Sequence, residues 1–160
     1  MNPRIKLVTE LYEVSERLAL KALNAVKTED LYERPLDKAN SFHWVFGHIT
    51  ASRYGLAKYI GMTESVPWEK LYEYGADVHD RSAYPTIDEI KTAFLEITKK
   101  LKARFETLTE KDLAGEPPFA IPGLEKSVAG ILAFMSFHES YHVGQLAYLQ
   151  RLHGGEKLVG

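Results

Sequence analysis

The chain has 160 residues, no cysteine and a formal net charge of -2 at pH 7. This length suffices for an ordinary hydrophobic core, so we expect a single domain over residues 1–160. The lack of cysteine excludes disulfides, thiolate metal sites and a cysteine nucleophile. The charge gives no reason to expect nucleic acid or an anionic membrane as a partner, and a small-molecule partner fits better.

The sequence also argues against a membrane location. No apolar run approaches the roughly 20 residues that a helix needs to cross a bilayer. Residues 1–20 mix charged residues with apolar ones, a pattern unlike that of a signal peptide. We therefore expect a cytoplasmic protein.

Two helices are predicted in the first part of the chain. Asn2 is suited to cap a helix and Pro3 to begin it, and an apolar stripe continues to Val26, which predicts a helix over residues 3–26. A connection follows, and Asn40 or Ser41 can cap a second helix that ends before Gly61. The segment after it is punctuated by proline and glycine and is rich in aromatic residues, which are Trp68, Tyr72, Tyr74 and Tyr84. We expect these residues to form a small core beneath a long loop, or less simply one wall of a substrate pocket.

Two further helices are predicted in the second part. Thr86 and Glu89 form a capping box, and apolar residues then recur at bundle spacing as far as Leu108. The last helix is expected over residues 125–152, before two glycines. The pattern predicts an all-α four-helix bundle. The link of about 24 residues between the second and third helices could span a helix of about 30 Å, so a parallel crossover is allowed there.

Two histidines near the end of the chain give the strongest functional signal. His138 and His142 are four residues apart, so they lie on one face of a helix and can reach a single divalent ion. Residues 138–142 also spell H-E-x-x-H, the metalloprotease motif in which Glu139 would act as a base. That motif needs a third ligand downstream, but Tyr148 stands at the position of the third histidine and only Glu156 follows.

A carboxylate-bridged di-iron bundle is a second template. Glu139 and His142 match one Glu-x-x-His half of such a site. No other glutamate precedes a histidine by three residues, so the second half is missing. Both the protease and the di-iron interpretations are therefore disfavoured.

His48 is the candidate for a third ligand, because it lies within an apolar helical stretch. A lone histidine there would more simply be a core residue that donates to a carbonyl group. The pair at His138 and His142 changes this balance and favours three nitrogen ligands with open positions for water or substrate.

Two polar neighbours are weaker candidates for catalysis or positioning. Gln145 lies on the stripe of His138 and His142, where it could orient a ligand or simply sit at the rim of the bundle. Glu139 is rotated about 100° from His138, so we expect it to support a ligand from behind or to face solvent. His43, His79 and His153 are expected to have no role at the site.

These residues resemble a known family. The H-x-x-x-H-x-G-Q core of residues 137–154 resembles the final helix of the DinB/YfiT-like superfamily. Residues 42–48, with Trp44 and His48, resemble its second helix, and Pro85 with Thr86 resembles the start of its third. The resemblance covers essentially the whole chain and assigns His48, His138 and His142 as metal ligands.

The resemblance implies a four-helix bundle of unusual connectivity that is commonly a homodimer and binds one divalent ion. Zinc or nickel is expected first, with manganese or iron as alternatives. Members of this family include transferases that couple low-molecular-weight thiols to electrophiles, a thiol-dependent isomerase and proposed hydrolases. Our leading hypothesis is a metal-dependent thiol transferase that acts on an electrophilic small molecule. The alternatives are a metal-dependent hydrolase, a non-catalytic metal-binding stress-response module, and a structural bundle without metal.

Overall fold

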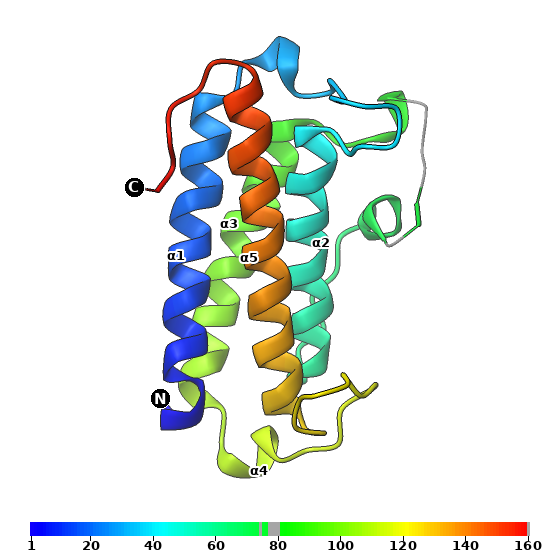
Figure 1. Cartoon of the computed structure of the whole chain (residues 1–160). Helices are drawn as coiled ribbons and strands as arrows, with labels where there is room; N and C mark the ends of the chain where they lie inside the picture. Colours follow the sequence, from blue (N-terminus) through cyan, green and yellow to red (C-terminus); the bar gives the residue numbers. More distant parts are fainter. Residues whose placement is uncertain (74, 77–80, 160) are drawn as a thin grey trace.

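A computed structural model describes residues 1–73, 75–76 and 81–159. Four long helices dominate it (Figure 1), and these are α1 (Pro3–Ala25), α2 (Phe42–Tyr59), α3 (Ile87–Thr107) and α5 (Val128–Leu152). Shorter helical segments lie in the connections, and these are η1 (Thr28–Asp30), η2 (Glu69–Tyr72), η3 (Arg81–Ala83) and α4 (Glu110–Leu113). The described residues contain no strand. The predicted all-α four-helix bundle is confirmed.

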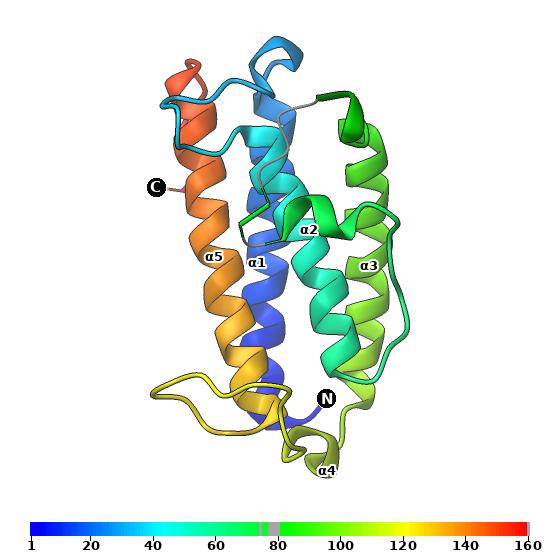
Figure 2. The same ribbon diagram turned by 90° about the vertical axis from the view of Figure 1, so that its right-hand side faces the viewer.

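The helices run in two parallel pairs. In Figures 1 and 2, α1 and α5 ascend, whereas α2 and α3 descend. Each helix packs against two others, since both α1 and α2 contact α5 and α3. Because α2 and α3 point the same way, the segment between them must return along the length of the bundle. The predicted long crossover between the second and third helices is therefore present.

Side-chain caps explain where the helices begin. Asn2 accepts a hydrogen bond from the backbone of Arg4, and Ser41 accepts one from the backbone of Trp44. Thr86 and Glu89 form the predicted capping box at the start of α3. These contacts satisfy backbone N–H groups that have no partner in the first helical turn.

Two features of the last third of the chain differ from prediction. The final helix begins at Val128 and not near Glu125, because Ser127 has an extended backbone and caps the helix by accepting from Gly130. The short helix α4 was not predicted. Its start is fixed by a second capping box, in which Thr109 pairs with Asp112.

The crossover is anchored to α2 by its aromatic residues. Tyr72 is fully buried, and its ring lies 5.5 Å from that of Trp68 and 5.3 Å from that of Tyr84. All three residues belong to or pack against one hydrophobic cluster of the bundle, as expected for a small core beneath the loop. Tyr74 and His79, which were also considered from the sequence, lie outside the described residues.

The apolar core has two parts. One cluster surrounds the first half of α2 and the second half of α5, and the other surrounds the second half of α2 and the first half of α5. Between these clusters, His48 and Arg53 on α2 contact His138, Glu139 and His142 on α5. None of the helices in the described part of the chain has the length and apolar character needed to cross a membrane.

Candidate metal centre

Three histidines from two neighbouring helices converge. His48 comes from α2, and His138 and His142 come from consecutive turns of α5. The Nε2 atom of His138 lies 3.2 Å from Nε2 of His48 and 3.1 Å from Nε2 of His142. Nitrogen atoms of all three lie within 4.8 Å of one another. The structure therefore brings together the three residues that the sequence selected.

The spacing of these nitrogen atoms suits a shared metal ion. Two imidazole nitrogens bound to zinc at about 2.0–2.1 Å and at the tetrahedral angle are separated by about 3.3 Å. The two printed separations, 3.1 and 3.2 Å, are close to this value. A cluster of three imidazole nitrogens with no carboxylate or thiolate is also a donor set typical of zinc and related ions.

Hydrogen bonds behind two of the rings fix their tautomers. Nδ1 of His48 lies 2.6 Å from the carbonyl oxygen of Tyr72, and Nδ1 of His142 lies 2.8 Å from Oε1 of Gln145. Because both oxygens can only accept, each Nδ1 must carry the hydrogen. Each Nε2 then presents a lone pair to the centre of the cluster. Such outer contacts orient metal-binding histidines in proteins and increase their basicity as ligands.

Burial keeps the rings uncharged. It lowers the pKa of His138 to about 4, assisted by repulsion from the two other imidazoles. Burial also lowers the pKa of His142 to about 4, although the hydrogen bond to Gln145 opposes it, and it lowers the pKa of His48. All three imidazoles are therefore neutral near pH 7, which is the state that binds metal.

His48 is held by Trp44 on one face of its ring and by the carbonyl group of Tyr72 at Nδ1. The indole of Trp44, one turn earlier, stacks on it with the ring centroids 4.9 Å apart and the planes 8° from parallel. The ring of Tyr72 occupies the space beside Gly47, where a Cβ atom would overlap it. Gly47 thus lets Tyr72 approach α2 closely enough for its carbonyl group to reach His48. Sequence reasoning missed this role, although a glycine in the middle of a helix was a signal for close packing.

Glu139 occupies neither of the positions expected for it. Its carboxylate is buried and accepts from Nε of Arg53 at 2.8 Å and from Nη2 of Arg53 at 2.6 Å. Arg53 also donates to the hydroxyl of Thr98 and to the carbonyl oxygen of Tyr12, and its guanidinium lies 4.3 Å from the ring centroid of Phe94. Glu139 therefore joins α5 to α2 as half of a buried ion pair. It does not contact a histidine of the cluster from behind, and it does not face solvent.

The other described histidines lie away from the centre. His43 is buried, and its Nε2 donates to the carbonyl oxygen of Pro85 at 2.9 Å. His153 caps the end of α5 with Nδ1 3.4 Å from Oδ1 of Asp30. Asp30, His153 and the exposed Glu33 form a second group of potential metal ligands. Ion pairs of this kind are common at protein surfaces.

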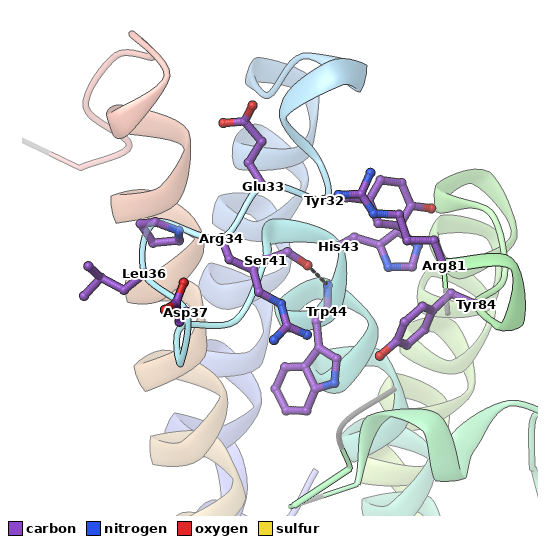
Figure 3. Close-up of a pocket in the computed structure, with 11 residues that line it drawn as sticks. Tyr32, Glu33, Arg34, Leu36, Asp37, Ser41, His43, Trp44, Arg81 and Tyr84 are labelled. Atoms are coloured by element: carbon purple, nitrogen blue, oxygen red, sulfur yellow. Dashed lines mark hydrogen bonds between the residues drawn. The ribbon is translucent and has the colours of Figure 1, made fainter. Parts of the chain in front are cut away.

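Two cavities are lined in part by residues 32–40. One has a volume of about 700 Å³ and is shown in Figure 3, with Trp44 at its lower edge. The other also has a volume of about 700 Å³, and its walls include Tyr141 and Gln145. Since Trp44 stacks on His48 and Gln145 bonds His142, each cavity adjoins one edge of the triad.

Comparison with known proteins places the chain in a family. The model of the DinB superfamily matches residues 11–146. The chain belongs to the DinB superfamily. This confirms the resemblance seen in the sequence.

Two solved structures from Bacillus subtilis are similar to the whole bundle. The first is the DinB-like protein YjoA, with a TM-score of 0.69, 17% sequence identity and 97% of both chains covered. The second is YfiT, described as a probable metal-dependent hydrolase with an unusual four-helix bundle topology. It has a TM-score of 0.65 and 15% identity, with 98% of this chain and 91% of YfiT covered. No curated protein sequence matches the chain.

Proposed function

We propose that this DinB protein holds one divalent metal ion through the Nε2 atoms of His48, His138 and His142, and that it couples a low-molecular-weight thiol to an electrophilic small molecule. The observation that carries the metal site is the convergence of three neutral imidazole nitrogens. Zinc or nickel suits these ligands best, with manganese or iron as alternatives. Three protein ligands leave at least one position open for a reactant.

The ion would supply the activation of the nucleophile, because a divalent cation lowers the pKa of a coordinated thiol or water toward neutrality. The chain contains no cysteine, so the sulfur must come from a cosubstrate. In the reaction, a sulfur–carbon bond forms, the bond from carbon to the leaving group breaks, and the leaving group takes its electron pair. The thiol proton passes to the leaving group or to solvent.

The buried ion pair favours a thiol over water as the nucleophile. A hydrolase built on H-E-x-x-H uses the glutamate to take a proton from water. Here both oxygens of Glu139 are bound by Arg53, so that carboxylate is not available as a base. A thiol ionises more readily than water and needs no such base. Gln145 would then orient His142, and the Tyr72 carbonyl would orient His48.

A metal-dependent hydrolase is the second candidate. It is favoured by the structural similarity to YfiT, which carries that description. The two candidates share the metal and differ in the nucleophile. A single assay can therefore separate them.

The test begins with metal content. Purified wild-type protein, loaded with zinc and dialysed, is expected to hold about one ion per chain by mass spectrometry. His48→Ala should lose it, and His153→Ala, a matched control outside the triad, should keep it. Equal metal content in all three proteins would contradict the proposed ligands.

The same three proteins then receive mercaptoethanol and chlorodinitrobenzene. We expect the thioether from wild type and His153→Ala, and background formation from His48→Ala. Dinitrophenol as the main enzymatic product would replace the thiol transferase with a hydrolase. Thioether formation at the wild-type rate by His48→Ala would exclude a role for the metal.

A further inference from the structure

The cavity that includes Tyr141 and Gln145 is lined mainly by apolar groups. Its volume is about 700 Å³, which is within the range of small-molecule sites. The apolar part of the lining includes Leu36, Val45, Leu149, Leu152 and the ring of Tyr148. Of the described residues that line the cavity, Lys38 alone carries a charge, and Lys38 is exposed. Because apolar walls cannot compensate a buried charge, the cavity suits an uncharged molecule.

One end of this cavity is next to the proposed metal ligand His142. Gln145 accepts a hydrogen bond from Nδ1 of His142, and the ring centroid of Tyr141 lies 5.0 Å from that of His142. Leu149 and Leu152 lie on later turns of α5, about 10–15 Å further along the helix at a rise of 1.5 Å per residue. The cavity therefore extends from the triad toward the C-terminal end of α5.

The hydrogen bonds of Gln145 determine how the hydroxyl of Tyr141 acts. Because Nδ1 of His142 donates to Oε1 of Gln145, the Nε2 end of the amide faces Tyr141 and donates to its hydroxyl oxygen at 3.2 Å. That oxygen is an acceptor here, and its own hydrogen remains to be donated. Within residues 1–73, 75–76 and 81–159, no group accepts this hydrogen. Tyr141 lines the cavity and is 57% exposed, so a bound molecule can accept it.

We propose that this cavity binds the electrophile of the proposed reaction, as an uncharged apolar molecule with an oxygen acceptor such as a ketone or nitro group, and that the Tyr141 hydroxyl donates a hydrogen bond to that oxygen. The assignment as a substrate rests on the proposed function, and it narrows the electrophile to this class. Binding itself does not depend on the metal, since none of the three proposed ligands lines the cavity.

The same hydrogen bond assists the reaction. When the thiolate sulfur bonds to a ring carbon that carries a leaving group, an electron pair of the ring moves onto the oxygen of an attached nitro group. The negative charge on this oxygen strengthens the hydrogen bond from Tyr141, which lowers the barrier. The electron pair then returns to the ring as the leaving group departs with its bonding pair. Tyr141 keeps its proton throughout.

Ligand binding by metal-free protein tests the cavity without the reaction. Acetophenone has a ketone oxygen, and α-methylstyrene has the same shape with a CH₂ group in its place. NMR titration of ¹⁵N-labelled protein should show saturable shifts at residues 38–40 and 144–149 of the lining. We expect an affinity for acetophenone about threefold to tenfold above that for α-methylstyrene. Tyr141→Phe should abolish this difference, whereas Tyr59→Phe, on the last turn of α2 and outside the cavity, should preserve it.

Turnover by the zinc-loaded protein provides a second comparison. With mercaptoethanol, Tyr141→Phe should lower kcat/KM for chlorodinitrobenzene about tenfold or more. It should leave kcat/KM unchanged for benzyl bromide, which has no oxygen acceptor. Tyr59→Phe should match wild type with both electrophiles. Zinc content equal to that of wild type shows that each variant is folded.

The outcomes separate this proposal from the proposed function. The absence of saturable acetophenone binding, equal affinities of wild type for acetophenone and α-methylstyrene, or a difference that persists in Tyr141→Phe would overturn the cavity proposal. Tighter binding of benzoate than of acetophenone would overturn the uncharged ligand class. The predicted binding without turnover of either electrophile would instead overturn the transferase and leave the binding site standing.

Discussion

Two polar clusters connect α2 to α5 in the middle of the bundle, and they are built in opposite ways. The pair of Arg53 and Glu139 is closed, because the carboxylate accepts two hydrogen bonds and the guanidinium has further partners in the hydroxyl of Thr98 and the carbonyl of Tyr12. The cluster of His48, His138 and His142 is open, because its Nε2 atoms face one another at 3.1 and 3.2 Å. The two clusters begin only five residues apart on α2.

The difference indicates that the pair of Arg53 and Glu139 stabilises the fold, whereas the three histidines are suited to bind an ion. A buried polar group whose partners lie within the chain contributes to the folded state and needs nothing else. Lone pairs that converge on one point repel each other unless a cation lies between them. In this molecule, the outer nitrogens of His48 and His142 are satisfied, and the inner ones are left for an added ion. The closed pair also fixes the register of the two helices that carry the ligands.

The largest expected effect comes from opening the closed cluster. Glu139→Ala would leave the guanidinium of Arg53 buried and unpaired, so we expect the free energy of unfolding of the metal-free protein to fall by about 3–5 kcal/mol. Urea denaturation followed by circular dichroism measures it. The double variant Arg53→Met/Glu139→Leu should recover most of the loss, because apolar residues of similar size leave no buried charge. Equal instability of both variants would show that the charge pair is not the cause.

Zinc binding to the three histidines should have the next largest effect on stability. Zinc at about 100 times its dissociation constant is expected to add about 2.7 kcal/mol to the free energy of unfolding of wild type. It should add nothing to His48→Ala, because the cluster then lacks one ligand. Thermal denaturation with and without zinc provides the measurement. Equal stabilisation of His48→Ala would place the ion elsewhere.

Gly47→Ala tests how the crossover supports the open cluster. The new methyl group would overlap the ring of Tyr72 and displace the carbonyl that accepts from His48. We expect a loss of about 1–3 kcal/mol in stability from overpacking and a zinc affinity lower by about tenfold or more. Gly55→Ala on the same helix meets no atom within 4 Å, so it should gain about 0.5–1 kcal/mol and keep its affinity. Matching results for the two variants would exclude the proposed role of Tyr72.

The smallest effect is expected at Gln145, which supports His142 from the half-exposed side. Gln145→Leu removes the acceptor of the 2.8 Å hydrogen bond and should weaken zinc binding by about tenfold to a hundredfold with little change in stability. Competition with a chelator gives the affinity. Gln145→Glu retains an acceptor at the same place and should bind zinc at least as tightly as wild type. Unchanged affinity in Gln145→Leu would show that this contact does not support the ligand.

Most of the fold could be predicted because its determinants are local. Capping residues such as Asn2, Ser41 and Thr86 mark where helices begin, and the apolar stripes give their extent. The start of the last helix was placed too early, because the residues before Ser127 are compatible with a helix and only the extended backbone of Ser127 sets the start at Val128. The helix α4 was missed because four residues have no measurable periodicity.

The candidate site was predictable in part. His138 and His142 share a helix, so spacing alone placed them together, whereas His48 required the assumption that α2 faces α5. The contacts of Glu139 and Tyr72 depend on how the helices are rotated and on where the crossover returns. Neither is encoded in a local pattern, which is why Glu139 was assigned to the wrong environment and the Tyr72 carbonyl was not foreseen.

Anomalous diffraction at the zinc absorption edge from crystals of the zinc-loaded protein tests the central claim most directly. We predict one strong peak per chain, located between the Nε2 atoms of His48, His138 and His142. An empty triad in crystals whose zinc peak lies elsewhere, for example beside Asp30 and His153, would contradict the account.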